Sequence, residues 1–266
     1  MSSLWLMYHD LFVDEPERWV PPTAAHYHVS SASFAAQLEV IKRSGLEILT
    51  AGEWRPEVRR KSVVLTFDDA WMGSIRLGLP ILLDAGFRAT YFVIRDFVGR
   101  RGFADDSALL EAHRAGMEVG VHGSSHRDLR HCTDAEIRRE LGDCQKYLQD
   151  LLGAPVISSS APGGGWNARI AAIAEELGFA TLSTSRPGLN DRRTSSHCLR
   201  RMSLRRQSTV DDVAKLCRFE LGAELWRWRV LQVPRRLMGD RLYTRLRRTL
   251  MRDKEHHEEI FRPPAS

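Results

Sequence analysis

Short apolar segments rich in β-forming residues alternate with segments of helical spacing, and this alternation constrains the fold more than any other feature of the chain. Strands that are each followed by a helix are typical of a parallel sheet with crossover helices. The pattern predicts strands at Leu4–Tyr8, Leu46–Leu49, Ser62–Phe67, Ala89–Ile94, Glu118–Val121, Val156–Ser159 and Ala180–Ser183. It predicts helices at Ser33–Ser44, Gly73–Ala85, Ser107–Ala115, Asp134–Leu152 and Asn167–Leu177.

The alternation continues to about residue 205 and fits one domain. The chain has 266 residues, of which 43% are hydrophobic, and α/β barrels commonly use this length as a single domain. We therefore expect one domain over residues 1–207. Residues 10–30 are too irregular and too rich in proline for a regular element, so a long loop over one face is expected there.

The pattern changes after residue 207 to two apolar and basic helical stretches, Val210–Val233 and Arg235–Met251, which Pro234 separates. We expect a basic amphipathic helical extension over residues 208–252. The remaining residues, 253–266, are charged or rich in proline and are expected to fray.

The positive charge of the chain belongs to this extension. Residues 200–252 hold 15 Lys and Arg against 5 Asp and Glu, a local charge of +10, whereas the whole chain carries +5. Two interpretations remain open: attachment to an anionic membrane surface, or a helix packed on the barrel with a solvated basic face, which we favour slightly. No nucleic-acid-binding motif accompanies the charge, so we expect no nucleic acid partner.

The first residues, the apolar runs and the cysteines of the chain bear on where in the cell the protein is located. Residues 1–8 contain no basic n-region, and the chain has no run of about 18 apolar residues. The four cysteines show no disulfide or zinc-ribbon spacing. These observations predict a cytoplasmic protein, with the basic extension allowing a peripheral position at the inner membrane surface.

Unusual polar or glycine residues follow four of the predicted strands. His9 follows the first strand, Asp68 and Asp69 follow the third, His122 follows the fifth, and residues 162–164 (Pro-Gly-Gly) follow the sixth. The carboxyl ends of parallel strands meet at one rim, where ligands and catalytic groups gather. The sequence therefore predicts one site at that rim.

Asp68, Asp69, His122 and His126 carry the strongest chemical signal at this rim. Two adjacent carboxylates behind an apolar strand repel each other unless a cation lies nearby, although aspartate is also a common helix cap. His122 and His126 are separated by three residues, a spacing that suits a metal clamp, although they could also be unrelated surface histidines. Two histidines and one carboxylate would leave open positions on a zinc-type ion, as catalytic sites require.

The segment SAPGGGWN offers weaker signals. Gly163 and Gly164 allow backbone N–H groups to approach a ligand and stabilise an oxyanion, although a plain strand-to-helix turn explains them equally well. Trp71 and Trp166 each lie near a motif and could stack on a sugar, with packing in the core as the alternative.

At these residues the sequence resembles the polysaccharide deacetylases, carbohydrate esterases built on the NodB-homology domain, over roughly residues 4 to 205. The segment TFDDA is similar to the family motif TFDDG, and HGSSHRDL is similar to its two-histidine motif. The resemblance implies that Asp68 is the catalytic base and that Asp69, His122 and His126 hold a divalent metal ion, with zinc favoured. It also implies a distorted (β/α)7-type barrel.

Three departures from the family pattern affect the other motifs. The motif RPPYG reads SAPGG here, so Ser160 stands where the arginine that orients the base would be, and we expect that arginine to be missing. No histidine stands in LRRMSL, where the family often has its general acid. Ala70 replaces a glycine, which is a small change.

The opening MYHD is similar to a permuted subgroup that includes deacetylases of poly-N-acetylglucosamine, in which the acid histidine comes from the first strand. That resemblance implies the acid role for His9, while His26 and His28 are weaker candidates that we interpret as loop residues.

The resemblance implies a metal-dependent hydrolase that removes acetyl groups, most of all N-acetyl groups, from a carbohydrate in exopolysaccharide or glycolipid biosynthesis. Its partners would be the acetylated carbohydrate and, through the basic extension, a membrane surface or a polysaccharide-synthesis complex. Two alternatives remain: a catalytically silent carbohydrate-binding relative, and a hydrolase of a non-sugar amide or imide.

Overall fold

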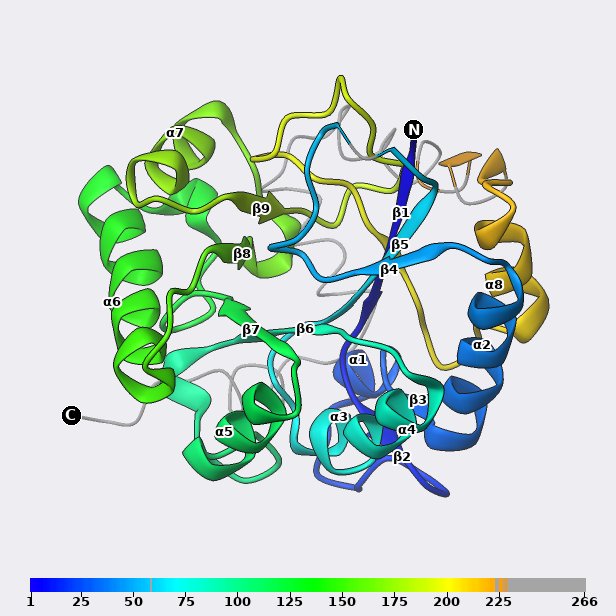
Figure 1. Ribbon diagram of the computed structural model, residues 1–266. Coiled ribbons are helices and arrows are strands. Elements are labelled where there is room, and N and C mark those ends of the chain that lie inside the picture. Colours follow the sequence, from blue (N-terminus) through cyan, green and yellow to red (C-terminus); the bar gives the residue numbers. More distant parts are fainter. Residues whose placement is uncertain (58, 223–224, 227, 229–266) are drawn as a thin grey trace.

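A curled parallel sheet surrounded by helices is the main feature of the structure, a computed structural model that describes residues 1–57, 59–222, 225–226 and 228 (Figure 1). Its eight strands are β1 (Ser3–Tyr8), β4 (Glu47–Leu49), β5 (Ser62–Phe67), β6 (Thr90–Val93), β7 (Glu118–Val121), β8 (Ser158–Ser160), β9 (Thr181–Ser183) and β10 (Met202–Ser203). The spatial order is β10-β1-β5-β6-β7-β8-β9, and β4 also pairs with β5. A second sheet contains β2 (Leu11–Phe12) and β3 (Val29–Ser30).

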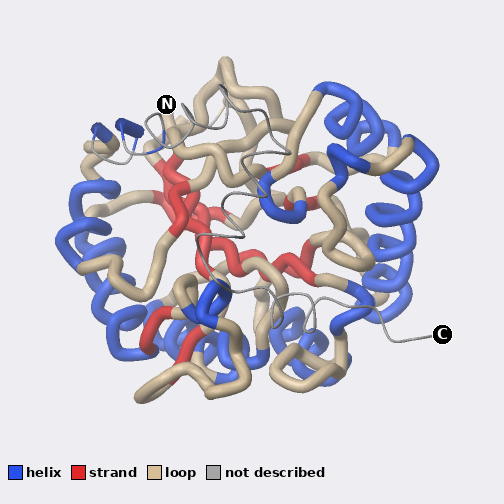
Figure 2. The backbone as a smooth tube through the Cα atoms, turned by 180° about the vertical axis from the view of Figure 1, so that it is seen from behind, coloured by secondary structure: helices blue, strands red, loops and turns tan. Residues whose placement is uncertain are grey.

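Helices cover the outside of the curled sheet, which occupies the centre of the molecule in both views (Figures 1 and 2). The α-helices are α1 (Pro22–Ala25), α2 (Ser31–Arg43), α3 (Met72–Arg76), α4 (Gly78–Ala85), α5 (Asp106–Arg114), α6 (Asp134–Leu152), α7 (Ala168–Glu176) and α8 (Val210–Cys217). Short 3-10 turns are η1 (Arg95–Phe97), η2 (Leu129–His131) and η3 (Pro162–Gly164). Among the described residues, none of these helices is long and apolar enough to span a membrane.

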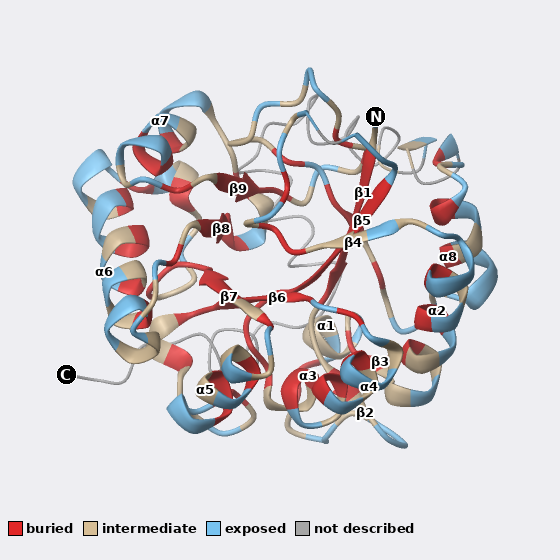
Figure 3. Ribbon diagram, in the orientation of Figure 1, coloured by how far each residue is buried: buried red, intermediate tan, exposed pale blue. Residues whose placement is uncertain are grey.

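Side chains alternate between the two faces of the sheet, and this alternation positions the site. Both β1 and β5 are buried along their whole length (Figure 3). Leu4 and Leu6 pack in the large core between the sheet and the helices, whereas Trp5 and Val64 join a smaller core inside the barrel. Because side chains alternate with a period of two, the side chains that face inward include residue 7 in β1 and residue 9 just after it, and residue 66 in β5 and residue 68 just after it.

The segment that ends in β10 closes the curled sheet. Leu199 forms a bridge with Ser183 of β9, and Met202 pairs with Leu6 of β1. This segment therefore runs between the two sides of the barrel. The expected α/β barrel of a single domain is confirmed.

Several predicted elements differ from the structure. The expected helix Gly73–Ala85 is two helices, α3 and α4, which meet at Leu77. The expected helix Val210–Val233 is interrupted, because α8 ends at Cys217 and Phe219 has a φ of 66°, in the left-handed region. Residues 223–224, 227 and 229–233 of this stretch lie outside the described residues. Helix α8 packs on the core through Val213 and Leu216. The predicted helix Arg235–Met251 and the tail at residues 253–266 lie outside the described residues.

Candidate active site

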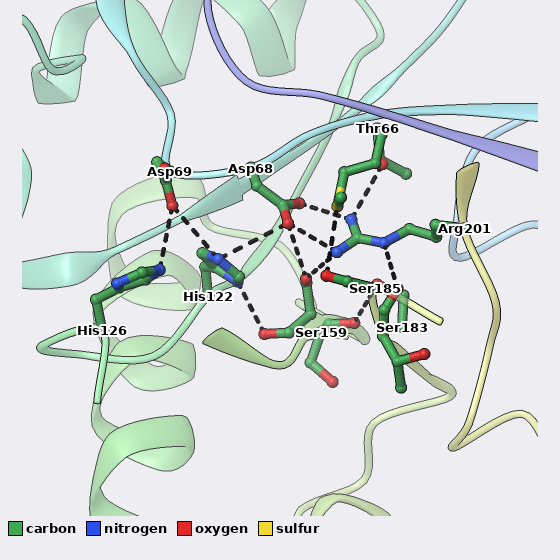
Figure 4. Close-up of polar contacts among 12 residues, drawn as sticks. Thr66, Asp68, Asp69, His122, His126, Ser159, Ser183, Ser185 and Arg201 are labelled. Atoms are coloured by element: carbon green, nitrogen blue, oxygen red, sulfur yellow. Dashed lines mark hydrogen bonds and ion pairs between the residues drawn. The ribbon is translucent and has the colours of Figure 1, made fainter. Parts of the chain in front are cut away.

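Three side chains predicted to bind a metal meet at the carboxyl end of the barrel (Figure 4). Asp69 follows β5, His122 follows β7, and His126 lies in the loop after β7. The Oδ1 atom of Asp69 lies 3.4 Å from Nε2 of His122 and 3.5 Å from Nε2 of His126. The three ligand atoms all lie within 4.8 Å of one another.

This geometry fits a divalent ion. Ligand atoms that are about 2.0 to 2.1 Å from a tetrahedral zinc ion lie about 3.4 Å apart, which matches both distances from Asp69. Asp69 Oδ1 is also buried and accepts no hydrogen bond. A buried carboxylate oxygen without a partner is costly, and a cation between the three residues would satisfy it.

Two neighbours orient these ligands. Nδ1 of His122 lies 2.9 Å from the Ser160 carbonyl oxygen. Because a carbonyl only accepts, Nδ1 carries the proton in the neutral ring, and the lone pair of Nε2 faces Asp69. On the other side, Nε1 of Trp71 donates to Oδ2 of Asp69 at 3.2 Å, so Oδ1 remains for the metal.

Glu140 of α6 holds the loop that carries His126. Its Oε2 accepts hydrogen bonds from the backbone N–H groups of Ser124 and Ser125 at 3.0 and 2.9 Å. The loop needs such support because His126 has a φ of 60°, a left-handed conformation that a residue with a Cβ seldom adopts. Asp69 shares this feature, with a φ of 71°.

Asp68 lies beside the metal site, with its carboxylate held by Arg201. Nη1 and Nη2 of Arg201 donate to Oδ1 and Oδ2 of Asp68 at 2.6 and 2.7 Å, which is a bidentate ion pair. Arg201 also donates to Ser160 Oγ at 2.8 Å and to Thr66 Oγ1 at 3.1 Å. Both members of the pair are buried, with 1% of Arg201 and 3% of Asp68 exposed.

Arg201 corrects the expectation that an orienting arginine is missing. Ser160 occupies the position of the motif arginine, and its hydroxyl accepts a hydrogen bond from the guanidinium that Arg201 supplies from the segment before β10. Sequence reasoning missed this residue because it searched LRRMSL only for a histidine. The sequence did contain a signal, the pair Arg200 and Arg201 next to a short apolar segment. Two consecutive residues of an extended segment face opposite sides, so one of the two arginines is expected to face the interior of the barrel.

The charges around Asp68 keep it ionised. Burial alone would raise the pKa of Asp68, but the Arg201 guanidinium and His122 outweigh burial and hold that pKa below its ordinary value. The pKa of Asp69 is also lowered, because its neighbouring histidines outweigh the effect of burial. Both carboxylates are therefore anionic near neutral pH.

His9 faces the same site from the end of β1. It lines a cavity of about 380 Å³ together with Asp68, Asp69, His122 and His126. Its Nδ1 atom is buried without a hydrogen-bond partner, and its ring lies 4.9 Å from that of Tyr27. Burial lowers the pKa of His9, while Asp69 and Asp68 act in the opposite direction.

The glycine and tryptophan candidates divide between the cavity and its surroundings. Gly163 and Trp71 line the cavity. The N–H of Gly164 donates to the Ala161 carbonyl at 2.8 Å and is therefore not available to an oxyanion in this structure. Trp166 does not line this cavity, and its Nε1 donates to the His197 carbonyl at 2.5 Å.

The two weaker histidine candidates also separate. His26 is exposed, whereas His28 is buried and lines the cavity. His28 lies in a loop, as expected, and its ring packs against Trp71 with the centroids 4.9 Å apart.

The sequence model of the polysaccharide deacetylase family matches residues 55–182, which include Asp68, Asp69, His122 and His126. The chain is similar to the polysaccharide deacetylase family over this range. Two relatives show the same similarity. YxkH of Bacillus subtilis (strain 168), named as a polysaccharide deacetylase, is 24% identical over 65% of this chain and 64% of its own length. Chitin deacetylase 1 of Cryptococcus neoformans is 30% identical over 43% of this chain and 24% of its own length.

Solved structures of other deacetylases share the fold. The Streptococcus pyogenes deacetylase PplD in complex with acetate has a TM-score of 0.72 and 24% identity over 81% of this chain and 97% of PplD. IcaB from Ammonifex degensii has a TM-score of 0.66 and 22% identity over 81% of this chain and 97% of IcaB. These likenesses show that the chain shares the fold of these deacetylases.

Proposed function

We propose that this protein is a metal-dependent deacetylase that hydrolyses acetyl groups, preferentially N-acetyl groups, of a carbohydrate. The observation that carries the proposal is the placement of a buried, arginine-held carboxylate beside three metal ligands. Oδ2 of Asp68 lies 3.8 Å from Nε2 of His122, so the two groups open into the same cavity. The match to the polysaccharide deacetylase family model supports the same reaction class.

The three ligands define where the acetyl group would bind. Asp69, His122 and His126 would hold the ion, with zinc favoured because two imidazoles and one carboxylate suit it. When bound, that ion supplies a Lewis acid for the acetyl carbonyl and makes a water molecule more acidic. Asp68 faces that position as the base and accepts a proton from the attacking water, because Arg201 keeps its carboxylate ionised and oriented.

His9 faces the cavity as the acid. In its protonated form it would donate a proton to the departing amine, which is a poor leaving group without one. The Gly163 N–H is the candidate donor to the oxyanion, since Gly163 lines the cavity.

The proposal extends to the setting of the reaction. A role in exopolysaccharide or glycolipid biosynthesis would place the protein in the cytoplasm, at times on the inner membrane surface. The support is the charge of +10 over residues 200–252, which suits anionic lipid headgroups or a polysaccharide-synthesis complex.

A substrate panel tests the proposed function. Acetate release from N-acetylglucosamine oligomers, an O-acetylated glycan, and a non-sugar amide and imide would be compared using zinc-loaded protein. We expect release from the N-acetylated sugar, and a loss on the order of 10²- to 10⁴-fold in Asp68→Asn. Hydrolysis of only the non-sugar compounds, or sugar binding without acetate release, would contradict the proposal and favour one of the two alternatives.

A further inference from the structure

The segment around β10 brings a second arginine to the cavity that contains the metal ligands. Met202 and Leu204 pack in the large core between the sheet and the helices. Because the side chains of an extended segment alternate between two faces, Arg201, Ser203 and Arg205 face the other way, into the barrel. Both Ser203 and Arg205 line the cavity of about 380 Å³. Arg205 is thus the second arginine that this segment directs inward.

Arg205 lies beside His9, the proposed acid. Strands β1 and β10 pair in parallel with Met7 opposite Ser203, so the same register places residue 205 opposite residue 9, just beyond both strand ends. The Arg205 backbone is held there by Ser208. Its N–H donates to Ser208 Oγ at 2.9 Å, and its carbonyl accepts from the Ser208 N–H at 2.8 Å. Arg205 therefore lies on the side of the cavity from which the amine of the sugar would leave.

The guanidinium of Arg205 is unpaired. Within the described part of the chain it makes no hydrogen bond or ion pair, and its Nε is buried without a partner. The residue as a whole is half-buried, so this cation is partly desolvated with no anion beside it, which is unfavourable. A guanidinium has five N–H donors and no acceptor. Because Nε is buried, Nη1 and Nη2 are the nitrogens that can reach a ligand in the cavity.

The acidic residues that line this cavity are engaged elsewhere. Among the described lining residues they are Asp68 and Asp69. Asp68 forms the bidentate pair with Arg201, and Asp69 accepts from Trp71 and faces the two ligand histidines. No carboxylate of the cavity wall therefore balances Arg205, and a divalent ion would add further positive charge. This excess of positive charge suits an anionic group on the ligand.

We propose that Arg205 binds a negatively charged group, a carboxylate or a phosphate, on the sugar that carries the acetyl group. This inference rests on the proposed function and adds that the preferred substrate is an anionic acetamido sugar rather than a neutral one. The planar guanidinium can form two parallel hydrogen bonds to two oxygens of either anion, whereas a hydroxyl group offers one oxygen without a charge. Arg205 is thus a specificity-determining residue that lies outside the sequence motifs.

Binding to the zinc-loaded full chain tests the role of Arg205. Calorimetry with Asp68→Asn, which we expect not to consume substrate, compares N-acetylglucosamine with three anionic forms of it: the phosphate esters at the anomeric carbon and at the primary hydroxyl, and the corresponding uronic acid. At least one anionic form should bind more tightly than the neutral sugar, and the form that binds most tightly distinguishes a phosphate from a carboxylate. Arg205→Gln should reduce this advantage by roughly ten- to a hundredfold, the effect of hydrogen bonds to a charged group, and Arg205→Lys should retain part of it.

The matched control is Arg206→Gln, which removes the same charge from an exposed neighbour that lies outside this cavity and pairs with Glu15. It should keep the advantage of the anionic sugar. Equal affinity for the neutral sugar and all three anionic forms would overturn the inference. An advantage that is unchanged in Arg205→Gln would also overturn it, because the zinc ion would then hold the anion. Equal losses in Arg205→Gln and Arg206→Gln would overturn it as well, because they would show a general effect of charge.

Acetate release by the chain with Asp68 intact is measured in parallel. The ratio of kcat/KM for the anionic sugar to that for the neutral sugar should exceed one, and it should fall in Arg205→Gln. Release that is equally fast from both sugars, with or without Arg205, would overturn the inference and leave the proposed function standing. Binding of an anionic sugar that depends on Arg205, without acetate release from any sugar, would contradict the proposed function alone.

Discussion

At the scale of single residues, the Asp68–Arg201 pair determines the protonation state of the proposed base. Asp68 must be ionised to accept a proton, so kcat/KM should fall at acid pH as its carboxylate is protonated. The pair is buried and bidentate, and its loss would leave a desolvated carboxylate without its principal cation. The pH dependence of turnover therefore reports directly on Arg201.

Arg201→Lys should move the acidic limb of the kcat/KM profile to higher pH. A lysine keeps a positive charge but cannot form two parallel hydrogen bonds, so the pKa of Asp68 rises toward its ordinary value. The neighbouring Arg200→Lys is the control, because Arg200 is exposed. An acidic limb that stays in place in Arg201→Lys would show that the arginine does not tune the base.

Relocation of the guanidinium extends this test. The double variant Ser160→Arg, Arg201→Ser places the arginine where the family motif carries it, next to the same carboxylate. We expect it to regain part of the rate that Arg201→Ser alone loses, measured as acetate release. No recovery in a folded double variant would contradict the equivalence of the two positions.

His9→Gln separates the acid role from a binding role. Protonation of an amine leaving group should be lost, lowering kcat for an N-acetyl sugar on the order of a hundredfold. An activated aryl acetate, whose leaving group needs no proton, should lose much less. Equal losses on the two substrates, measured by steady-state kinetics, would exclude His9 as the acid.

At the scale of elements, α6 stabilises a strained ligand loop from outside the site. The carboxylate of Glu140 accepts hydrogen bonds from the backbone N–H groups of Ser124 and Ser125. These two residues immediately precede His126, whose backbone is in the left-handed region. Ala70 shows the same feature, with a φ of 52°, which explains why the family motif has glycine at this position.

Glu140→Gln should weaken zinc binding by about ten- to a hundredfold, as is typical when groups that support metal ligands are lost. The amide cannot accept from both N–H groups with the strength of a carboxylate, so His126 loses its fixed position. Competition with a chromophoric chelator measures the Kd. Asp150→Asn on the same helix, an exposed residue paired with Lys146, should leave the Kd unchanged; a similar loss in both variants would show a general effect on the helix.

Local patterns predicted most elements, and long-range contacts explain the exceptions. Strands β5 and β7 match the predicted bounds, since each is an apolar run between polar residues. The split between α3 and α4 was missed because the apolar spacing continues across it. Pro80 lies in the first turn of α4, where its missing N–H costs nothing, so the sequence tolerates a new helix start at Gly78.

The residues of the site also divide into those that local motifs predict and those that depend on long-range contacts. Asp68, Asp69, His122 and His126 come from two short motifs, and sequence reasoning placed them together. Arg201 lies 133 residues from Asp68, and its role depends on how the barrel closes between β9 and β1. The burial of His28 against Trp71 depends in the same way on the packing of the segment at residues 10–30, which no local pattern specifies.

At the scale of the whole molecule, metal binding should be coupled to folding. The three ligands come from two strand ends and one loop, so the unfolded chain has no formed site. Zinc at about 100 times its Kd should therefore add about 2.7 kcal/mol of stability, or roughly 5 to 10 °C in Tm. Thermal unfolding with and without a chelator measures the shift, and Asp69→Ala should lose it; an equal shift in Asp69→Ala would place the zinc elsewhere.

The most direct test of the account is a zinc titration of the chelated protein, with acetate release from an N-acetylglucosamine oligomer followed at each step. The account predicts that activity rises with bound zinc and saturates at about one equivalent, and that Asp68→Asn binds the same equivalent without releasing acetate. Full activity in the chelated protein, or an unchanged rate in zinc-loaded Asp68→Asn, would contradict it.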